Sequence, residues 1–365
     1  MTKVLNITMH AVNNYGSVLQ ALATERIFQG LGYEVETLDY IQEGLQMDTI
    51  MKIIKNGGPG WKIKFKQIVL LLFSQTNDNK KTFDDFRNKY LHLSGRKYIS
   101  EKELFQDIPK ADIYCTGSDQ TWNTTLHGVS KAYFLAFPPD GKKRVSFAAS
   151  FGIEKLSHKD EKEVKNYLSK YSAISVRESS GLNILSEIGI KNGVHVLDPT
   201  LVVDNSFWNY LSEKKQYEGD YIFVYQLNSS SAFSNYVNEF AASKGLKVLY
   251  VRSRKNNRLR NSVYLGTPKP EVVLSLFKYS SYVLTDSFHA TVFSIIFHRN
   301  FVNILPPNFS TRIKSILTLM GLERRIVSDL NDLSCCDIPI NWLKVDSILN
   351  EERDKTIQFL KGALN

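Results

Sequence analysis

The chain has 365 residues, which is long enough for two domains that each bury a core. Its hydrophobic share of 43% and charged share of 23% are those of an ordinary globular protein and exclude an intrinsically disordered one. The formal charge of +9 indicates acidic partners, but no zinc-finger, helix-turn-helix or RNA-binding signature accompanies it, so we expect no nucleic-acid partner.

Strands and helices alternate along the first half of the chain. Short apolar runs predict strands over residues 4–9, 35–40, 112–116, 144–149 and 173–176. The segments between them predict helices over residues 18–31, 82–90, 159–169 and 179–188. This alternation is typical of an α/β protein with a doubly wound, mostly parallel sheet.

A second alternating series follows the polar stretch of residues 212–220. It predicts strands over 221–227, 246–252, 282–284 and 301–305, and helices over 232–244, 271–279 and 291–297. We therefore expect two Rossmann-like domains, residues 1–205 and 206–340, followed by an amphipathic helix in residues 341–365. Open α/β sheets bind ligands at the carboxyl ends of their strands, so we expect the two domains to face a cleft.

A basic and apolar segment interrupts the first series. Its lysines alternate with apolar and aromatic residues and stand at positions 52, 55, 62, 64 and 66. The apolar run that follows, residues 68–73, is too short to span a bilayer. Residues 52–73 fit an interfacial membrane helix. A helix packed on the protein's own core with a solvated basic edge explains the same residues.

Other compositional signals concern the compartment and metals. No leader of the secretory type opens the sequence, and its three cysteines suit a reducing compartment. The histidines are scattered, and no cysteines or histidines have the spacing of a zinc site. We therefore expect a cytoplasmic protein, either free or at the inner face of the membrane, with no bound metal.

Polar side chains follow the first predicted strand, where residues 10–17 lead into the first helix. Gly16 allows a close-packed or left-handed backbone, and Asn14 and Ser17 offer polar groups at the helix start. The corner lacks the glycine spacing of a dinucleotide-binding loop, which disfavours NAD. It fits either a ligand-binding corner or a plain turn with a serine cap.

The third predicted strand ends in a run of small and polar residues that includes a tryptophan. The run comprises Ser118, Asp119, Gln120, Trp122 and Asn123. Hydrogen-bonding groups beside an aromatic ring suit a sugar, because its hydroxyls need partners and its C–H face stacks on aromatic rings. We expect this corner to bind a sugar, with a structural polar turn as the alternative.

A histidine stands where the apolar strand over residues 282–284 gives way to an apolar helix. Asp286 or Ser287 can cap that helix, which places His289 in its first turn. The N–H groups and dipole of a helix start favour an anion, and an imidazole beside an anion can donate a hydrogen bond or a proton. The alternative is a capped core helix in which the histidine is only structural.

Five short motifs carry the polar residues of these corners and of two further segments. They are Asn-Tyr-Gly-Ser-Val-Leu-Gln at 14–20, Gly-Ser-Asp-Gln-Thr-Trp-Asn at 117–123, Ser-Val-Arg-Glu at 175–178, Asp-Pro-Thr at 198–200 and Thr-Asp-Ser-Phe-His-Ala at 285–290. In this order, over almost the whole chain, they resemble the motifs of the polysaccharide pyruvyl transferase family. The resemblance implies a GT-B-like fold and a ketal pyruvyl transferase. Such an enzyme moves a pyruvyl group from phosphoenolpyruvate to two hydroxyls of a sugar, in a bacterial-type surface polysaccharide or its lipid-linked precursor, and releases phosphate.

The implied reaction needs an acid and a base, and no cofactor beyond phosphoenolpyruvate as co-substrate. Protonation of the methylene carbon makes C2 electrophilic, and the sugar hydroxyls that attack C2 must lose their protons. We expect His289 to act as the acid or to bind the phosphate, and Asp119 to act as the base or to accept from a sugar hydroxyl. The acceptor side is expected in the first domain and comprises Asn14, Ser17, Ser118, Asp119, Gln120, Trp122 and Asn123.

The phosphate and carboxylate of the donor need cations or helix starts. Some family members have an arginine two residues before the matching histidine, whereas this chain has Ser287. We therefore expect the donor site to combine Ser287 with arginines from elsewhere, namely Arg177, Arg312, Arg252 and Arg254. Arg177 equally fits a salt bridge with Glu178 or Asp198. The basic loop that holds the last two arginines equally fits a solvated surface.

Two other functions fit the same scaffold. One is a GT-B glycosyltransferase that uses a nucleotide sugar, because the fold alone does not identify the donor. The other is a basic, membrane-associated assembly factor without catalysis. A lipid-linked oligosaccharide acceptor, with peripheral membrane contact through residues 52–73, fits both a cytoplasmic chain and its basic segment.

Overall fold

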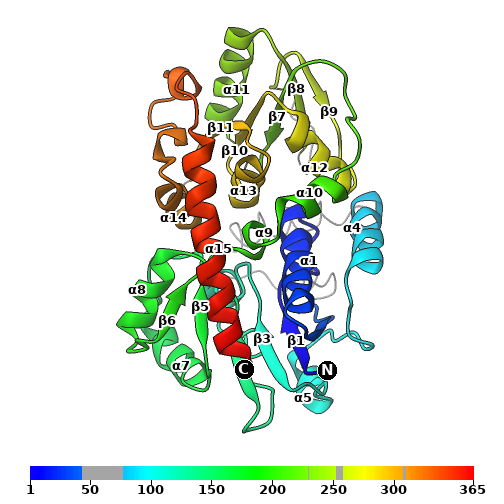
Figure 1. Ribbon diagram of the computed structural model, residues 1–365, viewed down its shortest axis with the longest axis vertical. Coiled ribbons are helices and arrows are strands. Elements are labelled where there is room, and N and C mark those ends of the chain that lie inside the picture. The colour runs from blue at the N-terminus through cyan, green and yellow to red at the C-terminus, as the bar shows by residue number, and fades with distance from the viewer. Residues whose placement is uncertain (43–76, 229, 252–257, 307–309) are drawn as a thin grey trace, which may run out of the picture. The chain divides into compact units, whose positions relative to one another are not determined.

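Two α/β units make up the chain, and in each of them strands and helices alternate (Figure 1). The computed structural model describes residues 1–42, 77–228, 230–251, 258–306 and 310–365. Unit 1 contains residues 1–203 and 352–365, and unit 2 contains residues 204–351. The C-terminal helix is therefore not a separate domain, because its residues are shared between the two units.

Unit 1 contains a parallel sheet in the order β2-β1-β3-β4. These strands are β1 (Lys3–Ile7), β2 (Glu34–Thr37), β3 (Ile113–Thr116) and β4 (Lys143–Ser146). A parallel pair, β5 (Ile174–Val176) and β6 (Gly193–His195), is joined to them through isolated bridges. The helices are α1 (Tyr15–Gly30), α4 (Asn77–Tyr90), α5 (Glu101–Gln106), α6 (Thr124–His127), α7 (His158–Leu168), α8 (Ser179–Glu187) and α9 (Pro199–Val202).

Unit 2 contains a parallel sheet in the order β11-β10-β7-β8-β9. Its strands are β7 (Tyr221–Tyr225), β8 (Lys247–Val251), β9 (Ser262–Tyr264), β10 (Tyr282–Thr285) and β11 (Asn300–Asn303). The helices are α10 (Asn205–Leu211), α11 (Ser231–Lys244), α12 (Pro270–Tyr279), α13 (Phe288–Ile296) and α14 (Thr311–Met320). Two 3-10 turns, Glu323–Arg325 and Ser334–Cys336, precede α15 (Trp342–Leu364), which ends in unit 1.

The strand β7 shows why these strands are apolar along their whole length. All five of its residues are buried. Ile222 and Val224 pack in one core cluster with Phe240 of α11, while Phe223 packs against Phe277 of α12, with ring centroids 4.8 Å apart. Helices thus cover both faces of the sheet, and a strand with two covered faces needs apolar side chains at every position.

The order of the strands reverses once in each sheet, between β1 and β3 in unit 1 and between β7 and β10 in unit 2. Ligands of open α/β sheets bind beside the carboxyl ends of the strands at such a reversal. The three polar corners of the sequence, residues 10–17, 117–123 and 286–289, follow β1, β3 and β10. Each unit therefore presents its polar corner where this fold binds ligands.

Candidate functional site

In unit 1 the corners after β1 and β3 are joined to each other. The hydroxyl of Thr8 donates to the backbone oxygen of Ser118 at 2.7 Å, and the amide of Gly117 donates to the backbone oxygen of Ile7 at 2.9 Å. A Cβ on Gly117 would lie 2.5 Å from Oδ1 of Asn6, so any larger residue here would force the side chain of Asn6 to shift. These two hydrogen bonds hold the two corners next to each other.

The first corner brings a serine hydroxyl to an aspartate of the second. Asn14 caps α1 by accepting from the amide of Gly16 at 2.8 Å, so the helix begins at Tyr15 rather than at the predicted residue 18. Ser17, in the first turn, donates from Oγ to Oδ2 of Asp119 at 2.6 Å. Two predicted acceptor residues that stand 102 positions apart in the chain are therefore in direct contact.

The backbone of Asp119 has a conformation that is uncommon for a residue with a side chain. Its φ is 76°, in the left-handed region, and such conformations cluster at functional sites. Its backbone oxygen accepts from the amide of Ser150 at 3.1 Å, and its Oδ1 accepts from the amide of Gln120 at 2.9 Å. Only 7% of the residue is exposed. The carboxylate is therefore held in a fixed direction, as a general base requires.

Arg177 lies among three carboxylates in unit 1. Its fully buried guanidinium places Nη1 2.7 Å from Oδ2 of Asp198, Nη2 3.5 Å from Oδ1 of Asp119 and Nε 4.0 Å from Oε2 of Glu178. Burial lowers the pKa of Arg177, but the three negative charges outweigh it and raise the pKa above its ordinary value. This is the salt-bridge alternative for Arg177. Its carboxylate surroundings disfavour an anionic donor, so the predicted donor role fits this geometry poorly.

Asp198 is a buried residue of this cluster. The sequence marks it through the Asp-Pro-Thr motif and as an alternative partner for Arg177, but not as a predicted site residue. Besides Arg177, its Oδ2 accepts from the hydroxyl of Ser118 at 2.8 Å. Its Oδ1 caps α9 by accepting from the amide of Thr200 at 3.0 Å and from the hydroxyl of Thr200 at 2.5 Å. The signal for this arrangement was the Asp-Pro-Thr motif, since an aspartate cap followed by proline is a typical helix start.

Trp122 is a core residue, and the predicted stacking of a sugar on its ring is wrong. The residue is 0% exposed, its indole N–H donates to the backbone oxygen of Tyr133 at 3.2 Å, and its ring stacks on Phe134. Asn123 is also fully buried and caps α6 by accepting from the amide of Thr125 at 3.1 Å. Both side chains stabilise the corner instead of facing a ligand.

The other predicted acceptor residues divide into two groups. Ser118 is fully buried, and its hydroxyl donates to Asp198. Asn14 and Gln120 keep partial exposure, and Ser17 and Asp119 keep a small exposed fraction. These last four residues carry the polar surface of the corner, and their contact with an acceptor stays a prediction.

In unit 2, Asp286 joins the corner after β10 to the loop after β7. Its Oδ1 accepts from the amide of Leu227 at 2.7 Å, and its Oδ2 accepts from the amide of Asn228 at 2.7 Å and from the side-chain amide of Asn228 at 3.1 Å. Burial raises the pKa of Asp286 above its ordinary value, although these donors oppose the shift. Asp286 therefore orders the two loops at the reversal point.

Ser287, not Asp286, caps α13. Its hydroxyl oxygen accepts from the amide of Ala290 at 3.5 Å, and its own amide donates to the hydroxyl of Thr285 at 3.0 Å. His289 lies in the first turn of the helix with 8% of its surface exposed. The structure thus places this histidine where a helix start favours an anion.

Arg312 is the predicted donor arginine that lies near this helix start. It stands in the first turn of α14, with its guanidinium carbon 5.9 Å from the ring centroid of Phe288, the residue that precedes His289. Its binding to the donor stays a prediction. Arg252, Arg254 and the basic segment of residues 52–73 lie outside the described residues.

Two general features complete the picture of the described residues. They contain no group of three or more histidine, cysteine, aspartate or glutamate side chains arranged to hold a metal ion. No helix among them combines the length and the apolar character needed to cross a bilayer.

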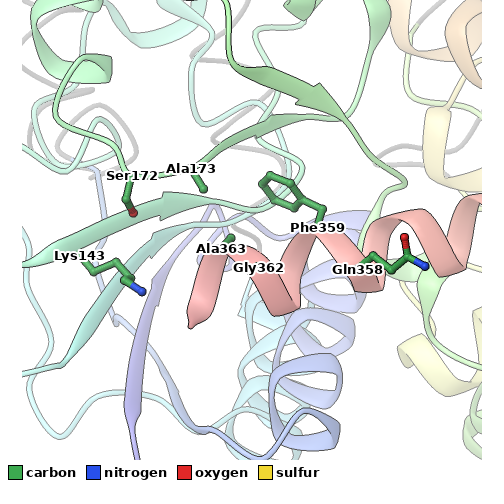
Figure 2. A pocket seen from close by; sticks show the side chains of 7 residues that line it. All are labelled: Lys143, Ser172, Ala173, Gln358, Phe359, Gly362 and Ala363. Carbon is green, nitrogen blue, oxygen red and sulfur yellow. The ribbon is translucent and has the colours of Figure 1, made fainter.

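A cavity of about 370 Å³ lies in unit 1 away from the polar corners. Figure 2 shows it between the residues that begin β4 and precede β5 and the last turns of α15, with Lys143, Ser172 and Phe359 on its walls. These positions belong to the amino ends of the strands, whereas the polar corners follow the carboxyl ends. The cavity is therefore no part of the candidate site.

Comparison with known proteins places this geometry in a family and a fold. The family model of polysaccharide pyruvyl transferase matches residues 14–306, and no curated protein matches the chain in sequence. A UDP-GlcNAc 2-epimerase from Neisseria meningitidis, bound to UDP-GlcNAc, is similar over 99% of this chain and 100% of its own, with 10% identity and a TM-score of 0.52. The S. aureus MnaA–UDP co-structure is similar over 96% of this chain and 88% of its own, with 10% identity and a TM-score of 0.53. These likenesses confirm the predicted GT-B-like fold.

Proposed function

Because the chain belongs to the polysaccharide pyruvyl transferase family, we propose that it transfers a pyruvyl group from phosphoenolpyruvate to two hydroxyls of one sugar. The product is a cyclic ketal, and phosphate is released. The family match carries this proposal, since residues 14–306 include all the predicted site residues of both units except Arg312. The family makes the chain a transferase acting on polysaccharide precursors; the donor and the identity of the acceptor are our proposal.

We assign the donor to the corner of unit 2. Phosphoenolpyruvate is an anion, and the start of α13 offers backbone N–H groups and the positive end of a helix dipole. His289 in the first turn can donate to the phosphate or protonate the methylene carbon. Arg312, next to Phe288, adds a positive charge on the neighbouring helix. The carboxylate of Asp286 is directed away from this donor site, because both of its oxygens accept from the loop after β7.

We assign the acceptor to the corner of unit 1. Sugar hydroxyls are neutral and need both donors and acceptors, which Ser17, Asp119 and Gln120 supply. Asp119 already accepts from the hydroxyl of Ser17 at 2.6 Å. Because a carboxylate has several lone pairs, a sugar hydroxyl can donate to it as well. Asp119 then takes the proton that the attacking hydroxyl loses.

The proposed reaction follows from these roles. An acid, for which His289 is the candidate, protonates C3 of phosphoenolpyruvate, and the electrons of the double bond form the new C–H bond. The first sugar hydroxyl attacks C2 and gives its proton to Asp119. The bond between C2 and the phosphate oxygen then breaks, and phosphate leaves with that electron pair. The second hydroxyl then attacks C2 and closes the ketal, and its proton passes to the departing phosphate.

Release of phosphate from phosphoenolpyruvate tests this proposal. We expect release that depends on an added glycan acceptor, with a pyruvyl ketal detected on the glycan by mass spectrometry. Turnover of a nucleotide sugar, with no phosphate release for any surface-polysaccharide precursor, would support the glycosyltransferase alternative instead. Because each step uses a side chain or a helix start, we propose that no metal or organic cofactor is needed. Chelator-treated enzyme should keep its rate.

The acceptor that we propose is a lipid-linked oligosaccharide at the inner face of the membrane. The basic and apolar character of residues 52–73 supports this proposal. Binding to vesicles that contain anionic lipid should weaken when the lysines at 52, 55, 62, 64 and 66 become glutamine. Unchanged vesicle binding would count against this segment as the contact.

A further inference from the structure

We propose that Asp198 keeps Asp119 basic by holding the guanidinium of Arg177 away from it. This inference rests on the proposed role of Asp119 as the base of the transfer reaction. Asp198 is then a positioning residue, because it acts through Arg177 and meets no substrate.

The unequal distances around Arg177 carry the argument. Its Nη1 lies 2.7 Å from Asp198, within the range of a charge-assisted hydrogen bond, whereas its Nη2 lies 3.5 Å from Asp119, beyond that range. A carboxylate that pairs closely with a guanidinium is stabilised in its charged form and loses basicity. The structure gives the closer pairing to Asp198 and leaves Asp119 with the weaker one.

Asp198 is held in place by donors on both oxygens. Oδ2 accepts from Arg177 and Ser118, and Oδ1 accepts from the amide and the hydroxyl of Thr200. The helix α9 that Asp198 caps packs on α1, the helix that carries Ser17. Asp198 therefore cannot follow Arg177 toward Asp119 without breaking the start of α9.

Two further titratable side chains, those of Glu178 and Tyr133, belong to the surroundings of Asp119 and Arg177. Glu178 turns its Oε1 to the hydroxyl of Ser150 and to the amides of Phe151 and Gly152, at 2.9 to 3.0 Å. Burial raises the pKa of Tyr133 far above its ordinary value, so that this phenol stays neutral. The basicity of Asp119 is thus set mainly by the guanidinium of Arg177 and by the two other carboxylates that pair with it.

The test measures the titration of Asp119 directly. Carbon-13 NMR of carboxyl-labelled aspartate, assigned with Asp119→Asn, follows the midpoint in the full-length protein. Asp198→Asn keeps the cap of α9 but removes one negative charge, so Arg177 is free to pair with Asp119 and the midpoint should fall by about one pH unit. Arg177→Met removes the cation, and the midpoint should rise by about one pH unit or more.

Two further variants keep the test decisive. Glu178→Gln removes the charge 4.0 Å from Arg177 and should lower the midpoint by less than Asp198→Asn. If Arg177→Met does not fold, this ranking of the two carboxylate variants is the result that tests the inference. Asp204→Asn is the matched control. Asp204 is also an aspartate cap, accepting from the amide of Ser206 at 2.7 Å, but its helix is α10 in unit 2, and the midpoint should not move.

The outcomes separate this inference from the proposed function. Opposite shifts in Asp198→Asn and Arg177→Met support the positioning role, whereas unmoved midpoints or shifts of the same sign overturn it. The pH below which kcat/KM falls should move with the NMR midpoint. A midpoint that moves while the pH profile of kcat/KM stays fixed would mean that Asp198 acts on Asp119 as inferred and that Asp119 is not the base.

Discussion

The two polar corners share one architecture but differ in the charged groups that they contain. Both follow a parallel strand at the point where the strand order reverses. In unit 1 the side chains of Asp119, Glu178 and Asp198 surround one arginine, which leaves an excess of negative charge. In unit 2 a helix start, His289 and Arg312 gather positive or proton-donating groups. The side chains that follow the strands, rather than the fold, therefore decide which ligand each corner suits.

The corners also use carboxylates for different purposes. Both oxygens of Asp286 in unit 2 accept from the backbone amides of Leu227 and Asn228, so this carboxylate stabilises the loops. Asp119 of unit 1 accepts from the hydroxyl of Ser17 and keeps a small exposed fraction. The two carboxylates are thus distinguished by their partners, and we propose the role of base for Asp119 alone.

The largest expected effect comes from removing the histidine of unit 2. His289→Ala eliminates the proposed acid or phosphate contact, and kcat for glycan-dependent phosphate release should fall by about 10² to 10⁴. His158→Ala is the matched control, because His158 also begins a helix but its side chain is 91% exposed, and its rate should equal that of the wild type. Wild-type turnover in His289→Ala would remove this residue from the mechanism.

The next effect concerns the stability of the unit 2 corner. Asp286→Ala leaves the amides of Leu227 and Asn228 without their acceptor, and the free energy of unfolding should fall by about 2 to 4 kcal/mol. Asp286→Asn keeps one carbonyl acceptor and should lose about half as much. Denaturant unfolding followed by circular dichroism measures both. Equal losses in the two variants would contradict the role given to the carboxylate.

The same aspartate should make stability depend on pH. Burial raises the pKa of Asp286 in the folded protein, so the folded state favours the protonated form more than the unfolded state does. The stabilisation from this group is complete below its unfolded pKa, near 3.8, and is lost as the pH rises through the folded pKa. Asp286→Asn should remove this component of the pH dependence, which unfolding at several pH values would reveal.

A smaller effect is expected at the corner of unit 1. Ser17→Ala removes the hydrogen bond to Asp119, and kcat/KM for the glycan should fall about tenfold, while KM for phosphoenolpyruvate stays within about twofold. Ser157→Ala breaks a similar bond, from Ser157 to Asp160 at 2.7 Å, on an exposed surface and serves as the control. A raised donor KM in Ser17→Ala would break the division of roles between the corners.

The smallest expected effect on catalysis concerns Trp122 and tests whether its ring is part of the core or contacts the glycan. Trp122→Phe should leave KM for the glycan unchanged, because the indole is buried against Phe134. The loss of the bond to Tyr133 should lower the free energy of unfolding by about 1 to 2 kcal/mol. A raised glycan KM without a loss of stability would return Trp122 to the acceptor site.

The buried strands and helices were predictable from sequence, whereas short, partly exposed strands were not. A strand such as β7, apolar at every position, and a helix such as α13 carry enough apolar residues to define a pattern. The strands β6 and β9 have three residues each, none of them fully buried, so no run of apolar residues marks them. Local patterns of this length do not distinguish strand from loop.

The site was predictable up to the point where tertiary packing decides. The ends of apolar strands located Asn14, Asp119 and His289, because polar residues stand directly after them. The bond from Ser118 to Asp198 joins residues 80 positions apart, and no local signal gives such a pair. The ring of Trp122 fitted a sugar platform and a core position equally well in sequence, and only its packing on Phe134 distinguishes them.

The binding of phosphoenolpyruvate alone tests most directly whether the anionic donor belongs to unit 2. Isothermal titration calorimetry would compare the wild-type protein with Asp119→Asn and His289→Ala, each checked for folding by circular dichroism. We expect Asp119→Asn to bind phosphoenolpyruvate within about twofold of the wild type and His289→Ala to bind it at least about tenfold more weakly. Unchanged binding in His289→Ala, with lost binding in Asp119→Asn, would contradict the assignment of the donor to the corner of unit 2.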